Sequence, residues 1–109
     1  MGREIKFRAF WRGEMAIQGN PDLETLASFM HHYADCELMQ FTGLKDKNGV
    51  DIYEGDILSN TNNQKKIVEF RDGCFFLSSI NKKIFKEFSK GYLNNKKVLG
   101  NIYENPELL

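Results

Sequence analysis

The stretch Leu38–Leu58, LMQFTGLKDKNGVDIYEGDIL, decides the fold because it places two turn signals between apolar runs. The first is KDKNG at Lys45–Gly49, where Asp46 can accept hydrogen bonds from the backbone ahead of it and Asn-Gly tolerates a positive φ. The second is YEGD at Tyr53–Asp56, which leads directly into an apolar strand start. We therefore interpret the stretch as two bends that join strand segments.

The acids of this stretch could instead bind a hard cation or act as a paired acid and base; they are Asp46, Asp51, Glu54 and Asp56. A calcium loop of the helix-loop-helix kind needs Gly at its sixth position and Glu at its twelfth. Counted from Asp46, these positions hold Asp51 and Ile57, so the calcium pattern fails. No nearby motif marks a substrate pocket. Turn formation is therefore favoured, and no metal ligand, cofactor or catalytic residue is assigned.

Alternation near the N-terminus predicts the first strand. In IKFRAFWR, residues 5–12, one face holds Ile5, Phe7, Ala9 and Trp11, and the basic residues Lys6, Arg8 and Arg12 are expected to point outward on the other. A turn at Gly13-Glu14 then leads into a second strand near residues 15–18.

Further strand signals follow along the chain. CELMQF, residues 36–41, predicts a short strand, and Asp72-Gly73 between KKIVEF and CFFLS is the strongest local hairpin signal. KKVLGNIY, residues 96–103, predicts a last strand, with ENPELL as an extended tail.

Two segments have helical spacing. NPDLETLASFMHHY, residues 20–33, begins with Asn20 as a cap and Pro21 at the first helical position, and its apolar residues form one stripe. INKKIFKEFSK, residues 80–90, also fits a short helical stripe, although Ile and Phe equally suit a strand. We expect the short amphipathic helix at residues 20–33; at residues 80–90 a helix is also expected, with a strand as the open alternative.

Composition bounds the class of protein. The chain has 109 residues and no net charge, but residues 21–60 hold eight acids and two bases, whereas residues 61–97 hold nine bases and three acids. Two solvated faces explain this layout most simply; a polyanion-binding patch or head-to-tail pairing between copies are the alternatives. No signal peptide or membrane-spanning run is recognised, so a soluble, cytoplasmic protein without membrane contact is expected.

Other chemical motifs are weak. Cys36 and Cys74 are expected to be reduced, and His31, His32 and Cys36 lack the four-ligand spacing of structural zinc. Aromatic residues that could stack on bases lie between lysines in the segment 65–97. The lysines that could bind a polyanion are Lys65, Lys66, Lys82, Lys83, Lys86, Lys90, Lys96 and Lys97. Core packing explains those aromatic residues better, because the chain is neutral rather than basic.

Four segments together resemble the YopX family of small phage and prophage proteins. They are REIKFRAF at residues 3–10, the opening stretch at residues 38–57, VEFRDGCFFL at residues 68–77 and GNIYENPELL at residues 100–109. The resemblance implies a phage or prophage origin and a mostly β fold with a small barrel, but no activity, because the family has no assigned function. Residues 81–95 depart from it, so the helix expected there has no support from the resemblance.

The expected fold is a single α+β domain over residues 1–109, mostly antiparallel β, partly closed into an SH3-like barrel with one short amphipathic helix. Its predicted core comprises Phe7, Trp11, Leu26, Met30, Phe41, Ile57, Phe70, Phe76 and Ile102.

The expected function is that of a non-enzymatic accessory protein that binds a host or phage protein and also self-associates. The candidate partner loop comprises Lys45, Asp46, Lys47, Asn48, Tyr53 and Glu54. Nucleic-acid binding through the lysines of residues 65–97 is the alternative.

Overall fold

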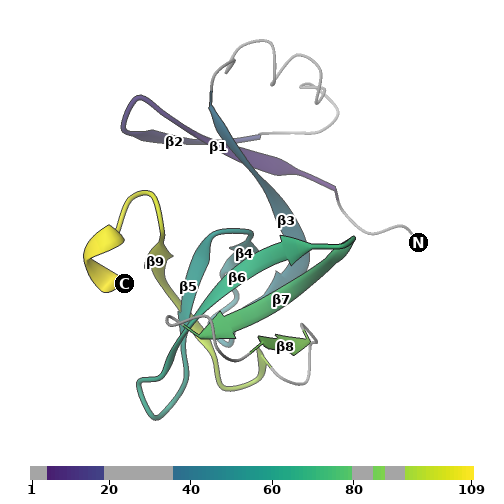
Figure 1. Cartoon of the computed structure of the whole chain (residues 1–109), viewed down its shortest axis with the longest axis vertical. Helices are drawn as coiled ribbons and strands as arrows, with labels where there is room; N and C mark the ends of the chain where they lie inside the picture. The colour runs from purple at the N-terminus through teal and green to yellow at the C-terminus, as the bar shows by residue number, and fades with distance from the viewer. Residues whose placement is uncertain (1–4, 19–35, 80–84, 88–92) are drawn as a thin grey trace.

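Two antiparallel sheets make up the computed structural model of the chain (Figure 1), which describes residues 5–18, 36–79, 85–87 and 93–109. Within these residues the strands are β1 Phe7–Trp11, β2 Glu14–Ile17, β3 Glu37–Lys45, β4 Asp51–Tyr53, β5 Asp56–Ser59, β6 Lys65–Arg71, β7 Cys74–Ser79, β8 Phe85–Glu87 and β9 Lys97–Asn101. One short 3-10 helix, η2, spans Pro106–Leu108.

The strand order is β2-β1-β3-β4 in one sheet and β8-β7-β6-β5-β9 in the other, and one of the two forms a half-barrel. The predicted antiparallel, mostly β architecture is confirmed. The helix predicted at residues 20–33 lies outside the described residues. No helix in the described part of the chain is long and apolar enough to cross a membrane.

Strand β3 connects the two halves of the molecule (Figure 1). Its first part pairs with β1, with Phe7 opposite Gln40, and its second part pairs with β4, with Lys45 opposite Asp51. The register shifts between Phe41 and Lys45, where Gly43 has a φ of 87°. Such an irregularity bends a strand, so β3 can serve two differently placed neighbours.

The hairpin turns follow from residues that accept a positive φ. Asp72 and Gly73 have φ values of 51° and 80°, which confirms the predicted β6–β7 hairpin. The β1–β2 turn lies one residue earlier than predicted, at Arg12 and Gly13, with φ values of 49° and 82°. This turn type needs a positive φ at both central residues and places Gly at the second, so Glu14 begins β2 instead.

Asp46 fixes the first turn of the middle stretch, as predicted. Its Oδ1 accepts hydrogen bonds from the backbone N–H groups of Asn48 at 2.8 Å and Val50 at 2.9 Å. Its Oδ2 accepts a third, from Val98 N–H of β9 at 2.8 Å. The buried carboxylate therefore shapes the turn and attaches it to the edge strand of the other sheet.

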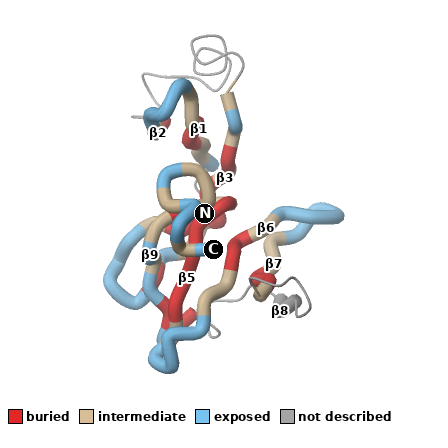
Figure 2. The backbone as a smooth tube through the Cα atoms, turned by 60° about the vertical axis from the view of Figure 1, so that its left-hand side comes forward, coloured by how far each residue is buried: buried red, intermediate tan, exposed pale blue. Residues whose placement is uncertain are grey.

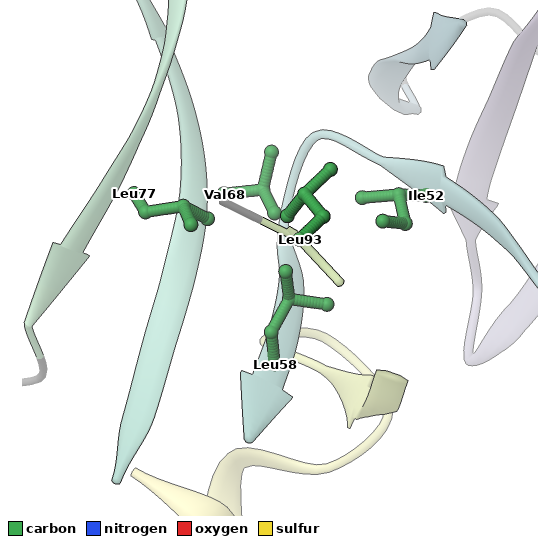
Figure 3. Close-up of a cluster of buried hydrophobic side chains, with 5 residues drawn as sticks. All are labelled: Ile52, Leu58, Val68, Leu77 and Leu93. Atoms are coloured by element: carbon green, nitrogen blue, oxygen red, sulfur yellow. The ribbon is translucent and has the colours of Figure 1, made fainter. Parts of the chain in front are cut away.

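The core lies where β4 of one sheet meets β5, β6 and β7 of the other. Five buried side chains point toward one another there (Figure 3): Ile52, Leu58, Val68, Leu77 and Leu93. Strand β5 is buried along its whole length (Figure 2), as expected for a strand covered on both faces. Of the predicted core residues, Phe41 and Ile57 are buried, which confirms them.

Phe70 was predicted to be a core residue, and this is wrong, because its side chain is 42% exposed. Phe70 shares a face of β6 with buried Val68, but it lies two residue pairs nearer the hairpin end, opposite Phe75. The face of β6 that carries Val68 therefore extends past the core and is exposed to solvent at Phe70. Phe7, Trp11, Phe76 and Ile102 are half-buried rather than buried, and Leu26 and Met30 lie outside the described residues.

Two local predictions near the C-terminus are wrong. The expected helix at residues 80–90 is replaced at Phe85–Glu87 by β8, which pairs with β7. A short apolar run can add to an open sheet edge, and spacing alone does not distinguish the two. The expected extended tail instead forms η2, which begins at Pro106, a residue whose fixed φ suits a first helical position.

Arg8 was predicted to point outward, and this is also wrong, because the residue is only 7% exposed. Its Nη2 lies 2.7 Å from Oδ1 of Asp56, at the start of β5. On the same face of β1, Phe10 stacks on Tyr103 with ring centroids 5.4 Å apart. The face that alternation marked as solvated therefore packs against the other sheet, with a carboxylate supplied for the buried cation.

Candidate interaction cleft

An open cleft of about 310 Å³ lies between β6 and the segment that follows β9. Met39 and Val68 are buried members of its lining, and Ile102 is half-buried. Phe70 and Leu109 also line it and are 42% and 53% exposed, respectively. The cleft is therefore mostly apolar and open to solvent.

The β4–β5 turn forms one side of the cleft through Gly55. Its N–H donates to Val68 O at 2.8 Å, and its carbonyl accepts from Ile102 N–H at 3.0 Å. Its φ is 89°, and a Cβ there would lie 3.1 Å from the Met39 sulfur. Glycine thus satisfies both the backbone conformation and the close approach to Met39.

The opposite side of the cleft is fixed by the side chain of Asn101. Its Oδ1 accepts hydrogen bonds from Tyr103 N–H at 3.0 Å and Glu104 N–H at 2.8 Å. Farther along, the Lys65 ammonium donates to Leu108 O at 3.0 Å. These bonds hold the C-terminal segment beside β6, so the cleft is preformed.

The polar lining of the cleft is acidic. Glu54 is half-buried, and burial raises the pKa of its carboxyl despite hydrogen bonding by the Gln40 backbone and the charge of Arg8. Glu69 lies 3.4 Å from Arg71, measured between Oε2 and Nη2. The hydroxyl of Tyr103 donates to Glu37 at 3.4 Å. An apolar cleft with acids around it can accept an apolar side chain with a basic group beside it.

The predicted partner loop does not form one surface. Lys45, Lys47 and Asn48 are exposed, whereas Asp46 and Tyr53 are buried. Glu54 lines the cleft described above, beyond the second turn. The structure thus separates the loop tip from Tyr53 and Glu54.

Four of the eight predicted polyanion-binding lysines are described: Lys65, Lys66, Lys96 and Lys97. Lys65 and Lys97 both pair with Ser59 from opposite sides of β5, so they share a face of the sheet. Lys65, however, is hydrogen-bonded to the C-terminal segment, and Lys96 is buried. Lys82, Lys83 and Lys90 lie outside the described residues, as does the side chain of Lys86. Nucleic-acid binding stays a prediction, which gel shifts at low and moderate salt would test.

Both cysteines lie within the described residues. Cys36 is half-exposed, Cys74 is exposed, and neither forms a disulfide. In the described ranges no three His, Cys, Asp or Glu side chains are grouped so that they could hold a metal ion. His31 and His32 lie outside those ranges.

The cleft could not be located from the sequence, although three of its residues were singled out, with Glu54 assigned to the partner loop. Phe70 and Ile102 were assigned to the core, which captures their apolar character but not their exposure. The available signal was the position of Phe70, two residues before the Asp-Gly turn, where a strand extends beyond the core. Leu109 has no such signal, because its place depends on the contacts of the C-terminal segment.

A family model and two solved structures match the chain. The family model described as YopX protein matches residues 13–109. The crystal structure of protein EF1440 from Enterococcus faecalis is 28% identical, covers 99% of this chain and 99% of its own, and superposes with a TM-score of 0.66. The crystal structure of YopX from Bacillus subtilis is 18% identical over 95% of this chain and 97% of its own, with a TM-score of 0.60, which shows a shared fold. No curated protein matches the chain.

The family match covers most of the chain and includes the cleft, the middle stretch and the Asp-Gly hairpin. The protein belongs to the YopX family.

Proposed function

We propose that the protein is a non-enzymatic interaction module of phage or prophage origin, with an SH3-like barrel, that binds a segment of another protein in its apolar cleft. The observation that carries the proposal is the exposure of two large apolar side chains, Phe70 and Leu109, beside the buried Met39 and Val68. Contiguous exposed apolar surface in a cleft is typical of binding sites. The proposed setting is the cytoplasm of a bacterial host.

The charges around the cleft select the chemistry of the partner. Glu54 and Glu69 both line it, and Tyr103 brings Glu37 close through its hydroxyl. An acidic segment would meet like charges at this surface, which disfavours its binding. We therefore expect a segment that places an apolar side chain in the cleft and a lysine or arginine beside it.

A display library of short random peptides tests this proposal with the full chain as bait. Selection should enrich peptides that combine an apolar residue with a neighbouring basic one. Phe70→Ser should weaken binding of the selected peptides, because it removes an exposed apolar wall. The matched control is Leu99→Ser, which removes a similarly exposed apolar side chain outside the cleft and should leave binding unchanged.

Enrichment of acidic peptides, or equal binding by both variants, would contradict the proposal. A second copy of the chain is the other possible occupant. Light scattering across micromolar concentrations separates the two, because self-association through the cleft makes the apparent mass rise with concentration and Phe70→Ser would abolish the rise.

A further inference from the structure

We infer that Glu54 determines the specificity of the cleft by pairing with the basic group of the bound segment. The inference rests on the proposed function and names the residue that recognises the charge of the partner. Glu54 lies in the β4–β5 turn, directly before Gly55, and lines the cleft together with Met39 and Val68. A cation bound there would meet a carboxylate next to apolar surface.

The carboxylate of Glu54 forms no ion pair with any lysine or arginine in the described part of the chain. Arg8 approaches from β1, but its Nη2 donates to the backbone carbonyl of Glu54 at 3.3 Å and to Oδ1 of Asp56 at 2.7 Å. Arg8 and Asp56 therefore neutralise each other as a buried pair. The negative charge of Glu54 is left largely uncompensated.

Partial burial makes this uncompensated charge costly. Glu54 is half-buried, and burial raises the pKa of its carboxyl by more than the Gln40 backbone and the charge of Arg8 lower it. A carboxylate that has lost part of its hydration without gaining an opposite charge is destabilised. A lysine or arginine of a bound segment would supply that charge, in a place where salt screens it less than at an open surface.

The other two acids near the cleft have less to offer a cation. Glu69 lines the cleft, but its Oε2 lies 3.4 Å from Nη2 of Arg71, so a ligand cation would compete with an arginine already present. Glu37 is exposed, does not line the cleft and accepts a hydrogen bond from Tyr103. Ion pairs at exposed positions contribute little, because water and salt screen them.

The turn that carries Glu54 lies against the strand that carries the exposed apolar wall. Gly55 N–H donates to Val68 O at 2.8 Å, and Phe70 follows Val68 by two residues on the same face of β6. A bound segment can therefore place an apolar side chain against Phe70 and a basic group at Glu54 at the same time. An acidic segment would be repelled by Glu54, and a neutral one would form no ion pair with it.

A double-mutant cycle tests the inference with a peptide from the selection described above, made once with lysine at its basic position and once with norleucine there. Norleucine keeps the alkyl chain of lysine but carries no charge. Glu54→Gln should weaken binding of the lysine peptide about tenfold, as expected for one lost hydrogen bond between charged groups. Binding of the norleucine peptide should be unchanged, because that peptide has no charge for Glu54 to recognise.

Glu69→Gln is the matched control, because it removes a second carboxylate from the same cleft. It should change the affinity for either peptide by no more than about twofold. Equal weakening of both peptides by Glu54→Gln would indicate a merely structural role and overturn the inference, as would a loss of lysine-peptide binding in Glu69→Gln that matches the loss in Glu54→Gln.

The outcomes also separate this inference from the proposed function. If Phe70→Ser weakens binding of the lysine peptide while Glu54→Gln binds it as tightly as the wild type, the cleft is the binding site and only the role of Glu54 is wrong. If no peptide binds, or if Phe70→Ser has no effect, the proposed function is wrong and the inference falls with it. Glu54→Gln is expected to fold, because glutamine has nearly the same size and removes only a poorly compensated charge.

Discussion

Asp56 joins three elements with one carboxylate. It begins β5, its Oδ1 accepts from Arg8 of β1, and its Oδ2 accepts from Tyr53 N–H at 2.8 Å. Asp51 resembles it in sequence but pairs with two lysines and keeps a quarter of its side chain exposed, at 26%. Asp56 therefore joins buried elements of the fold, whereas Asp51 forms ion pairs nearer the surface.

We expect Asp56→Ala to lower the free energy of unfolding by about 3–5 kcal/mol, because it leaves the Arg8 cation buried without its partner. Asp51→Ala should cost only about 1 kcal/mol, since partly exposed ion pairs contribute little. Urea denaturation of the two variants measures both values. Similar losses would show that burial of the ion pair is not what distinguishes them.

The pH dependence of stability should differ in sign between two acids. Burial raises the pKa of Glu54, so the folded protein binds that proton more tightly than the unfolded chain does. Its contribution to the free energy of unfolding therefore rises as pH falls from the raised pKa toward the ordinary value of about 4.3. For Asp51, burial raises the pKa, but Lys45 and Lys6 together outweigh it and hold the pKa below its ordinary value. Its stabilising contribution is lost as pH falls through that lowered pKa.

Unfolding free energies of Glu54→Gln and Asp51→Asn, each compared with the wild type across acidic pH, measure these contributions. The advantage of the wild type over Glu54→Gln should grow as pH falls, and its advantage over Asp51→Asn should shrink. Curves that run parallel to the wild type for both variants would argue against the pKa shifts.

The β4–β5 turn is the element on which the cleft depends. Its glycine bonds to β6 on one side and to the residue after β9 on the other, so the turn links the two neighbours of β5. The turn lies directly between β4, which pairs with β3, and β5, which is buried along its whole length. Its conformation therefore sets how the two sheets meet.

Gly55→Ala should destabilise the protein more than Gly13→Ala does. Both glycines have a positive φ, and an L residue there costs about 1–2 kcal/mol. At Gly13 nothing lies within 4 Å of an added Cβ, whereas at Gly55 it would crowd the Met39 sulfur at 3.1 Å. Thermal unfolding of both variants provides the comparison. Equal losses would mean that only the backbone conformation matters and not the packing.

Sequence patterns predict the local turns well and the long-range contacts poorly. The turn at Asp46 and the Asp72-Gly73 hairpin were predicted, because their chemistry lies within a few residues. The inward position of Arg8 was not, because its partner is 48 residues away. The strand β8 was missed for a related reason: a short apolar segment pairs with whatever sheet edge is available.

In the whole molecule, the fold brings acids of the segment 21–60 into ion pairs with bases that are distant in sequence. The acidic segment 21–60 and the basic segment 61–97 were interpreted most simply as two solvated faces of opposite sign. Instead, Asp51 and Asp56 pair with Lys6 and Arg8 near the N-terminus. The cleft likewise has walls from β6 and from the C-terminal segment, which are joined by the Lys65–Leu108 hydrogen bond. Neither feature has a local signature, so neither could be predicted without the fold.

Methyl NMR of the full chain with a selected apolar and basic peptide tests the proposed function most directly. We predict that the signals of Met39, Val68 and Ile102 shift on binding, since these residues line the cleft. Shifts confined to Leu99, or to the exposed tip around Lys47 and Asn48 in the amide spectrum, with the cleft signals unmoved, would contradict the account.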